Sequence, residues 1–131
     1  MTPRTKAQPR PTDAELEILR ILWERGPSTV REVHESLGDS RGTGYTTVLK
    51  LLQIMTEKGI VRRDETERAH VYEARAPREE TENVLVGDLL DRAFAGSASA
   101  LVLRALSTKK ASAQELATIR KLLDELEGGR R

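Results

Sequence analysis

The sequence predicts a mainly α protein with one small β-hairpin, arranged as two segments that follow one another along the chain. Apolar residues recur at helical spacing through most of the sequence, a strand-like pattern replaces that spacing over residues 60–75, and Ala76-Pro77 interrupts the chain. We therefore expect four regions: a flexible basic N-terminus at 1–11, a first domain at 12–77, a helical domain at 78–127 and a frayed tail at 128–131.

Three helices are expected in the first domain, at residues 13–25, 30–37 and 45–58. The first two begin at capping boxes, in which a hydroxyl residue, Thr12 or Thr29, is followed three places later by Glu. A glycine stands directly after each of the three expected helices, and glycine is the residue that most often ends a helix.

A two-stranded hairpin is expected over residues 60–75, because Ile60 to Arg63 and His70 to Ala74 read as strands on either side of a polar turn. Two strands are marginally stable alone, so the hairpin must pack against the helices. The order helix, short helix, helix, hairpin is that of a winged helix-turn-helix. In that architecture the second helix of the helix-turn-helix pair, here 45–58, enters the major groove of DNA, and the hairpin forms the wing.

This layout gives a set of candidate DNA contacts. The start of the helix at 45–58 is rich in threonine, whose hydroxyl can bond a base edge or a phosphate. Arginines of the hairpin suit the DNA backbone or a narrow minor groove, and hydroxyls at the start of helix 30–37 suit a phosphate. Tyr45 has an alternative, which is to pack on its own domain. The candidates are Ser28, Thr29, Thr43, Tyr45, Thr46, Thr47, Lys50, Arg62, Arg63 and Arg68.

Three further helices are expected in the second domain, at 78–94, 98–106 and 113–127. A segment this short does not comfortably enclose a core, so we expect a helical dimerisation domain whose core is shared with a second copy. A two-fold dimer would set two DNA-reading helices about 34 Å apart, one helical turn of DNA. The alternative is a core within one chain. The candidate residues are Leu85, Leu89, Leu101, Leu106, Leu116, Ile119 and Leu123.

Composition argues against several other classes. The chain has no Cys, which excludes disulfides, thiolate metal sites and thiol catalysis. His34 and His70 have no hydroxyl or thiol partner at a recognisable spacing, so neither an enzyme nor a cofactor is expected, and a dedicated metal site is disfavoured. A carboxylate–His site across a dimer stays open. The net charge of +1 does not by itself indicate a nucleic-acid partner. The runner-up to DNA binding is a protein-interaction module, in which the helical tail binds a partner helix instead of a second copy.

No apolar run approaches the roughly 20 residues of a membrane span, and the N-terminus has no apolar stretch of the kind that signal peptides contain. We therefore expect a cytoplasmic protein with no membrane partner. The N-terminal stretch is basic through Arg4, Lys6 and Arg10, with no acidic residue among them.

Several segments follow one another in a specific order and spacing: Thr12 to Gly26, Gly44-Tyr45-Thr46-Thr47-Val48, Glu57 to Arg63, Arg68 to Tyr72, Phe94-Ala95-Gly96-Ser97 and Ser112 to Leu126. Together they resemble the penicillinase-repressor family, of the BlaI/MecI/CopY type. The resemblance runs from about residue 10 to 127, and it implies a homodimer of winged-helix domains that binds an inverted-repeat operator and represses transcription. By similarity, Tyr45, Thr46, Thr47 and Lys50 are recognition-helix positions, and Arg68 lies in the wing.

The resemblance also implies ways of ending repression. In the beta-lactam branch of the family, a signalling protease cleaves the dimerisation domain at an Asn-Phe bond, and the matching bond here is Ala93-Phe94, where Asn is replaced. In the copper branch a Cys-rich tail binds the metal, and the absence of Cys excludes copper sensing of that kind. Derepression by proteolysis is thus the expectation, and a ligand-responsive regulator without proteolytic control is the alternative.

Overall fold

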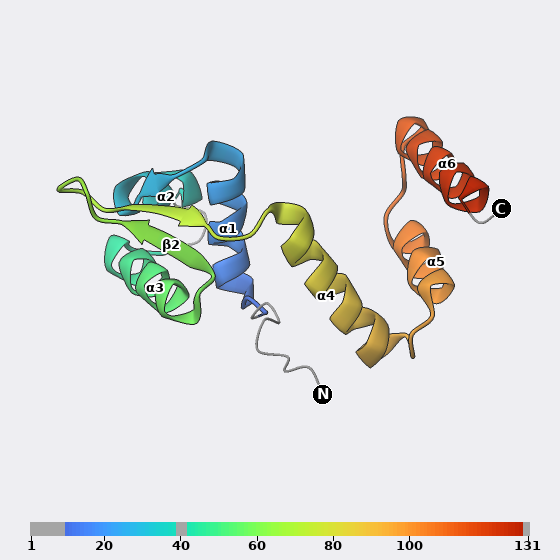
Figure 1. The fold of residues 1–131 in the computed structure, drawn as a ribbon, viewed down its shortest axis with the longest axis horizontal. Helices are drawn as coiled ribbons and strands as arrows, with labels where there is room; N and C mark the ends of the chain where they lie inside the picture. The colour runs from blue at the N-terminus through green and yellow to red at the C-terminus, as the bar shows by residue number, and fades with distance from the viewer. Residues whose placement is uncertain (1–9, 39–41, 130–131) are drawn as a thin grey trace. The chain divides into compact units, whose positions relative to one another are not determined.

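Six helices and a small sheet make up the part of the chain that the computed structural model describes, residues 10–38 and 42–129 (Figure 1). The chain divides into two units, residues 1–87 and 88–131. The elements are α1 (Asp13–Arg25), β1 (Ser28–Thr29), α2 (Val30–Leu37), α3 (Tyr45–Lys58), β2 (Val61–Asp64), β3 (Val71–Ala74), α4 (Arg78–Ala93), α5 (Ala98–Thr108) and α6 (Ala113–Gly128).

The mainly α fold with a small β element is confirmed, with small differences at the ends of the later helices. Helix α4 stops one residue earlier than expected, α5 continues to Thr108, and α6 includes Gly128, which was expected to lie in the tail. Most of the expected flexible N-terminus, residues 1–9 with Arg4 and Lys6, and the tail residues 130–131 lie outside the described residues.

Capping boxes begin α1 and α2 as the sequence predicts. At α1 the Thr12 hydroxyl accepts from the Glu15 backbone N–H at 3.2 Å, and the Thr12 N–H donates to the Glu15 carboxylate at 2.9 Å. Thr29 and Glu32 make the same reciprocal pair at the start of α2. These bonds satisfy N–H groups that a helix start otherwise leaves unpaired, so both helices begin at a defined residue.

The sheet has three strands in the described part of the chain, which corrects the expected two-stranded hairpin. Strand β1 pairs antiparallel with β3, with Ser28 opposite Tyr72, and β2 pairs with the other edge of β3. The sequence indicates only a helix cap at residues 28–29, because two residues are too few to show an alternating pattern. The extra strand ties the start of α2 to the hairpin.

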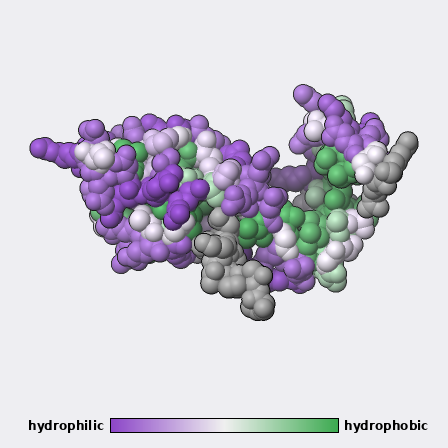
Figure 2. Space-filling view, in the orientation of Figure 1, coloured by the Kyte–Doolittle hydropathy of each residue, from purple (hydrophilic) through white to green (hydrophobic). Residues whose placement is uncertain are grey.

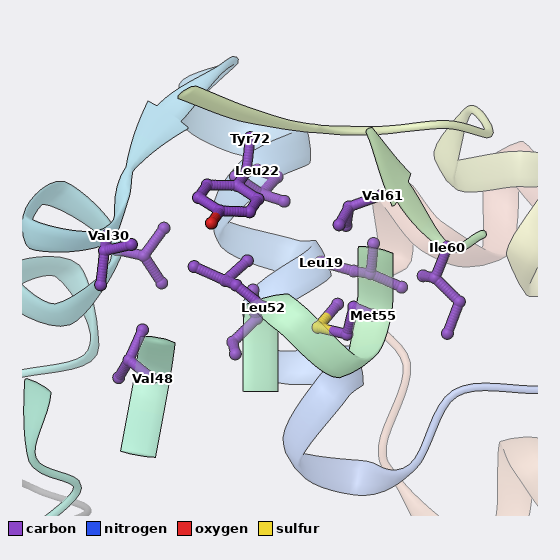
Figure 3. Packing of buried hydrophobic residues seen from close by; sticks show 11 residues of the cluster. Leu19, Leu22, Val30, Val48, Leu52, Met55, Ile60, Val61 and Tyr72 are labelled. Carbon is purple, nitrogen blue, oxygen red and sulfur yellow. The ribbon is translucent and has the colours of Figure 1, made fainter. Parts of the chain in front are cut away.

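One apolar core holds these elements together (Figure 3). Tyr72 of β3 is 1% exposed and packs with side chains from all three of the first helices. Burial of the inner side of α3 turns its opposite side to the surface. The core residues are Ile18, Leu19, Leu22, Val30, Val33, Val48, Leu52, Met55, Ile60, Val61 and Tyr72.

Trp23 of α1 holds the segment that joins β3 to α4. Its indole Nε1–H donates to the backbone carbonyl of Ala76 at 3.0 Å. The guanidinium of Arg78 lies 5.5 Å from the centre of the indole ring and also pairs with Glu24 at 3.6 Å. A hydrogen bond, a cation–π contact and an ion pair thus fix the first residues of α4 on α1.

Replacing Trp23 with Phe is expected to lower the free energy of unfolding by about 1 kcal/mol or somewhat more, because a smaller aromatic ring remains under Arg78 but the bond to Ala76 is lost. Urea unfolding followed by circular dichroism measures this loss. Glu24→Gln is the matched control, and since it weakens only an exposed ion pair it should change stability by less than about 0.5 kcal/mol. Equal stability of the two variants would contradict the role given to the indole N–H.

The C-terminal helices have no core of their own. No side chain of α5 or α6, all of whose residues the structure describes, is buried. Leu103, Leu122, Leu123 and Leu126 are each more than half exposed. None of the helices in the described residues is long and apolar enough to cross a membrane.

Candidate nucleic-acid interface

The outer side of α3 presents a row of polar side chains. Thr46, Lys50 and Gln53 are exposed at three- and four-residue spacing, opposite the buried Val48 and Leu52. Hydroxyl, ammonium and amide groups can all bond to base edges in a major groove, and Gln suits adenine. The expected Thr46 and Lys50 therefore lie on one accessible side of the helix. Gln53 is an addition to the candidates, and its helical spacing from Lys50 is the signal that identifies it.

A hollow of about 490 Å³ lies beside this row, between the start of α2, the start of α3 and the wing. It brings together three expected residues that are distant in the sequence, Thr29, Tyr45 and Arg68. Arg31 and His70 also line it, and no sequence pattern indicates Arg31 as a candidate. Arginines, a phenol and a hydroxyl around one hollow are the groups that bind DNA phosphates.

The arginines of the wing differ in whether they form ion pairs with acidic residues of the same domain. Arg62 pairs across the strands with Glu73 at 3.5 Å, and the next residue, Arg63, pairs with Glu65 at 2.7 Å. A hydrogen bond with Tyr72, together with the charge of Glu65, raises the pKa of Arg63 above its ordinary value. Arg68 makes no ion pair with any residue that the structure describes, and it is exposed. Arg68 is therefore the wing cation with the fewest competing contacts.

Burial removes Ser28 from the candidate contacts. Its side chain is fully buried, and its hydroxyl donates to the Gly26 carbonyl at 2.8 Å. The expectation that Ser28 reaches a phosphate is therefore not supported, since its position in β1 turns the side chain inward. Thr29 is half-buried, and its hydroxyl oxygen accepts the Glu32 N–H while the residue lines the hollow.

Tyr45 and Thr43 flank Gly44 at the start of α3 and contact His34 of α2. The Tyr45 ring lies edge-on to the His34 ring, with centres 6.1 Å apart, and Tyr45 remains 49% exposed. Tyr45 therefore packs on its domain and still has an exposed side chain, and its contact with DNA stays a prediction. Thr43 is half-buried, and Thr47 is exposed one residue beyond Thr46.

Within the described residues, no group of three or more His, Asp and Glu side chains is placed to hold a metal ion. The buried carboxylate of Glu15, on α1, binds the Lys58 ammonium at 2.8 Å. This pair joins α1 to the end of α3.

The chain matches the family model described as penicillinase repressor over residues 11–125. It is 36% identical over 119 residues to a transcriptional regulator BlaI of Mycobacterium tuberculosis, covering 89% of this chain and 85% of that protein. It is 24% identical over 120 residues to the penicillinase repressor of Bacillus licheniformis, covering 92% of this chain and 94% of that protein.

Solved structures also resemble this fold. The DNA-binding domain of the repressor BlaI, determined in solution, aligns with a TM-score of 0.50 at 23% identity, over 56% of this chain and 89% of that domain. A MarR family protein from Bacillus stearothermophilus aligns with a TM-score of 0.51 at 19% identity, over 92% of this chain and 75% of that protein. At these identities the two likenesses support the fold alone.

Proposed function

Because this chain belongs to the penicillinase-repressor family of DNA-binding transcriptional repressors, we propose that it acts as a homodimer on an inverted-repeat operator. It is a transcriptional regulator and not an enzyme. In each copy the row Thr46, Lys50 and Gln53 enters the major groove, and the wing with Arg68 lies on the backbone. The observation that carries this proposal is the exposed polar side of α3 with the arginine-lined hollow beside it. We expect the protein to act in the cytoplasm, where the chromosome is.

Support for a second copy comes from the apolar surface of the C-terminal helices (Figure 2). Leucines at helical spacing on α6 are exposed, and a monomer rarely leaves such a surface to water. Closing these faces against a second copy would remove them from solvent and pair two DNA-reading units. Of the expected dimerisation residues, Leu89, Leu106 and Leu123 are exposed, and Leu85, Leu101, Leu116 and Ile119 are half-buried.

For derepression we propose proteolysis at the Ala93-Phe94 bond by a signalling protease. Helix α4 ends at Ala93, and the backbone then leaves the helix, with Ala95 at a φ of 50° and Gly96 at 80°. A helix end opens for a protease at lower cost than a helix interior. The alternative is a ligand-responsive regulator without such a cut, in which case repressor length would stay constant during induction.

DNA binding is tested by measuring affinity for the DNA upstream of the chain's own gene at several salt concentrations. Phosphate contacts release counterions, so the binding constant should fall steeply with salt. Arg68→Ala should weaken binding on all sequences and reduce the magnitude of the slope of log K against log salt by about 1. Lys110→Ala, which removes the same charge from the second unit, should leave the slope unchanged. Binding that does not respond to salt would favour the protein-interaction module.

A further inference from the structure

The start of α3 lacks the side-chain cap that the neighbouring helices have. Its N-cap is Gly44, and no side chain of the described residues bonds to the first N–H groups of the helix. Helices α1 and α2 begin instead at full capping boxes on Thr12 and Thr29. A glycine offers no side chain to hold a helix start in place, so the position of the first turn of α3 must depend on contacts from elsewhere.

His34 supplies such contacts on both sides of Gly44. Its Nε2 lies 3.1 Å from the backbone carbonyl of Thr43. A carbonyl oxygen can only accept, so Nε2 carries the hydrogen and donates it. The same ring meets Tyr45 edge-on, at an angle of 77° between the ring planes.

The His34 ring itself is firmly placed. It is half-buried on α2, next to Val33, which is fully buried in the core. The capping box at Thr29 and the pairing of β1 with β3 fix the start of the same helix. A rigid short helix thus carries one side chain that binds the residue before Gly44 and the residue after it.

We propose that His34 is a positioning residue for sequence reading, which sets the register of the first turn of α3 on the bases. This inference rests on the proposed DNA-binding function. Base contacts by Thr46 and Thr47 need hydrogen-bond geometry that a small shift of the helix start destroys, whereas contacts to phosphates tolerate such a shift. Loss of His34 should therefore lower discrimination between operator and random DNA more than it lowers affinity for DNA in general.

The test uses the full chain and an operator that the unaltered protein selects from random-sequence DNA. The measured quantity is the ratio of the dissociation constants for random and selected DNA. His34→Ala removes both contacts and should lower this ratio about tenfold, the cost of about one mismatched base pair. His34→Phe keeps a ring and loses the donor, and His34→Gln keeps a donor and loses the ring, so each should lower the ratio by less.

Val33→Ala is the matched control. It opens a cavity in the core beside the same helix and should lower the melting temperature, yet it keeps the His34 side chain that binds Thr43 and Tyr45, so the ratio should stay at the value of the unaltered protein. A ratio that is unchanged in His34→Ala would overturn the inference. So would a drop of the same size in Val33→Ala, because that would mean the ratio reports stability alone. Failure of the unaltered protein to select any DNA would overturn the proposed function itself, and the inference with it.

Discussion

Leu123→Asp is expected to convert the protein into a monomer and to weaken operator binding by about a hundredfold or more. Leu123 is 54% exposed on α6, on the same side as Leu116, Ile119 and Leu126. If this side closes against a second copy, an aspartate there would bury a carboxylate without a partner, which costs several kcal/mol. Each monomer would then have one recognition helix, and the second half-site would no longer be bound intramolecularly.

Sedimentation at low micromolar concentration measures the first effect, and a gel shift on the selected operator measures the second. Ala117→Asp is the control, since it adds the same charge to the opposite side of α6 and should remain dimeric. The core of the first unit contains no residue of α6, so the melting of that unit should be unaffected by either change. A Leu123→Asp protein that still sediments as a dimer would show that the interface lies elsewhere.

Local signals predicted the helices of the first unit, because caps and stop residues act within one turn of the chain. Thr12 and Thr29 with their glutamates, and the glycines that follow each helix, define the ends of α1, α2 and α3 in the structure. Strand β1 was not predicted, because the strand with which it pairs, β3, lies more than 40 residues further along the chain. Two residues carry too little pattern to reveal such a pairing.

The candidate interface was predictable where exposure follows helical spacing and unpredictable where it depends on distant contacts. Spacing alone placed Thr46 and Lys50 on the outer side of α3. It could not show that β1 buries Ser28, or that Arg31 shares a hollow with the wing. His34 looked like a lone histidine because its partners, Thr43 and Tyr45, belong to a different helix and its preceding turn.

The far end of α3 is held by an ion pair between the buried Glu15 and the partly exposed Lys58. The Lys58 ammonium donates to both oxygens of the Glu15 carboxylate, at 2.8 and 3.1 Å, and Glu15 is only 2% exposed. Burial alone would raise the pKa of Glu15, but the bonds from Lys58 and from the Thr12 backbone, with the charge of Lys58, lower it below the ordinary 4.5. A lowered folded-state pKa adds stability that is present above the unfolded pKa and is lost as the pH falls through the folded pKa.

Lys58→Met is therefore expected to cost about 3 kcal/mol at pH 7, because it leaves the Glu15 carboxylate buried without its cation. Without Lys58, only the bonds from Thr12 are left to oppose burial, so the pKa of Glu15 should lie higher than in the unaltered protein. The cost should accordingly shrink as the pH falls toward about 4, where protonation removes the unpaired charge. Urea unfolding of both proteins at a series of pH values measures this difference.

Glu15→Gln in the Lys58→Met background separates the charge from the packing. Glutamine keeps the capping-box bond with Thr12 and carries no charge, so the double variant should recover most of the stability that Lys58→Met loses at pH 7. Recovery would mean that the lysine is needed mainly because the glutamate is charged. If the double variant is as unstable as Lys58→Met, or if the cost of Lys58→Met is the same at pH 4 as at pH 7, the unpaired charge of Glu15 is not the cause of the loss and the electrostatic role given to Lys58 is wrong.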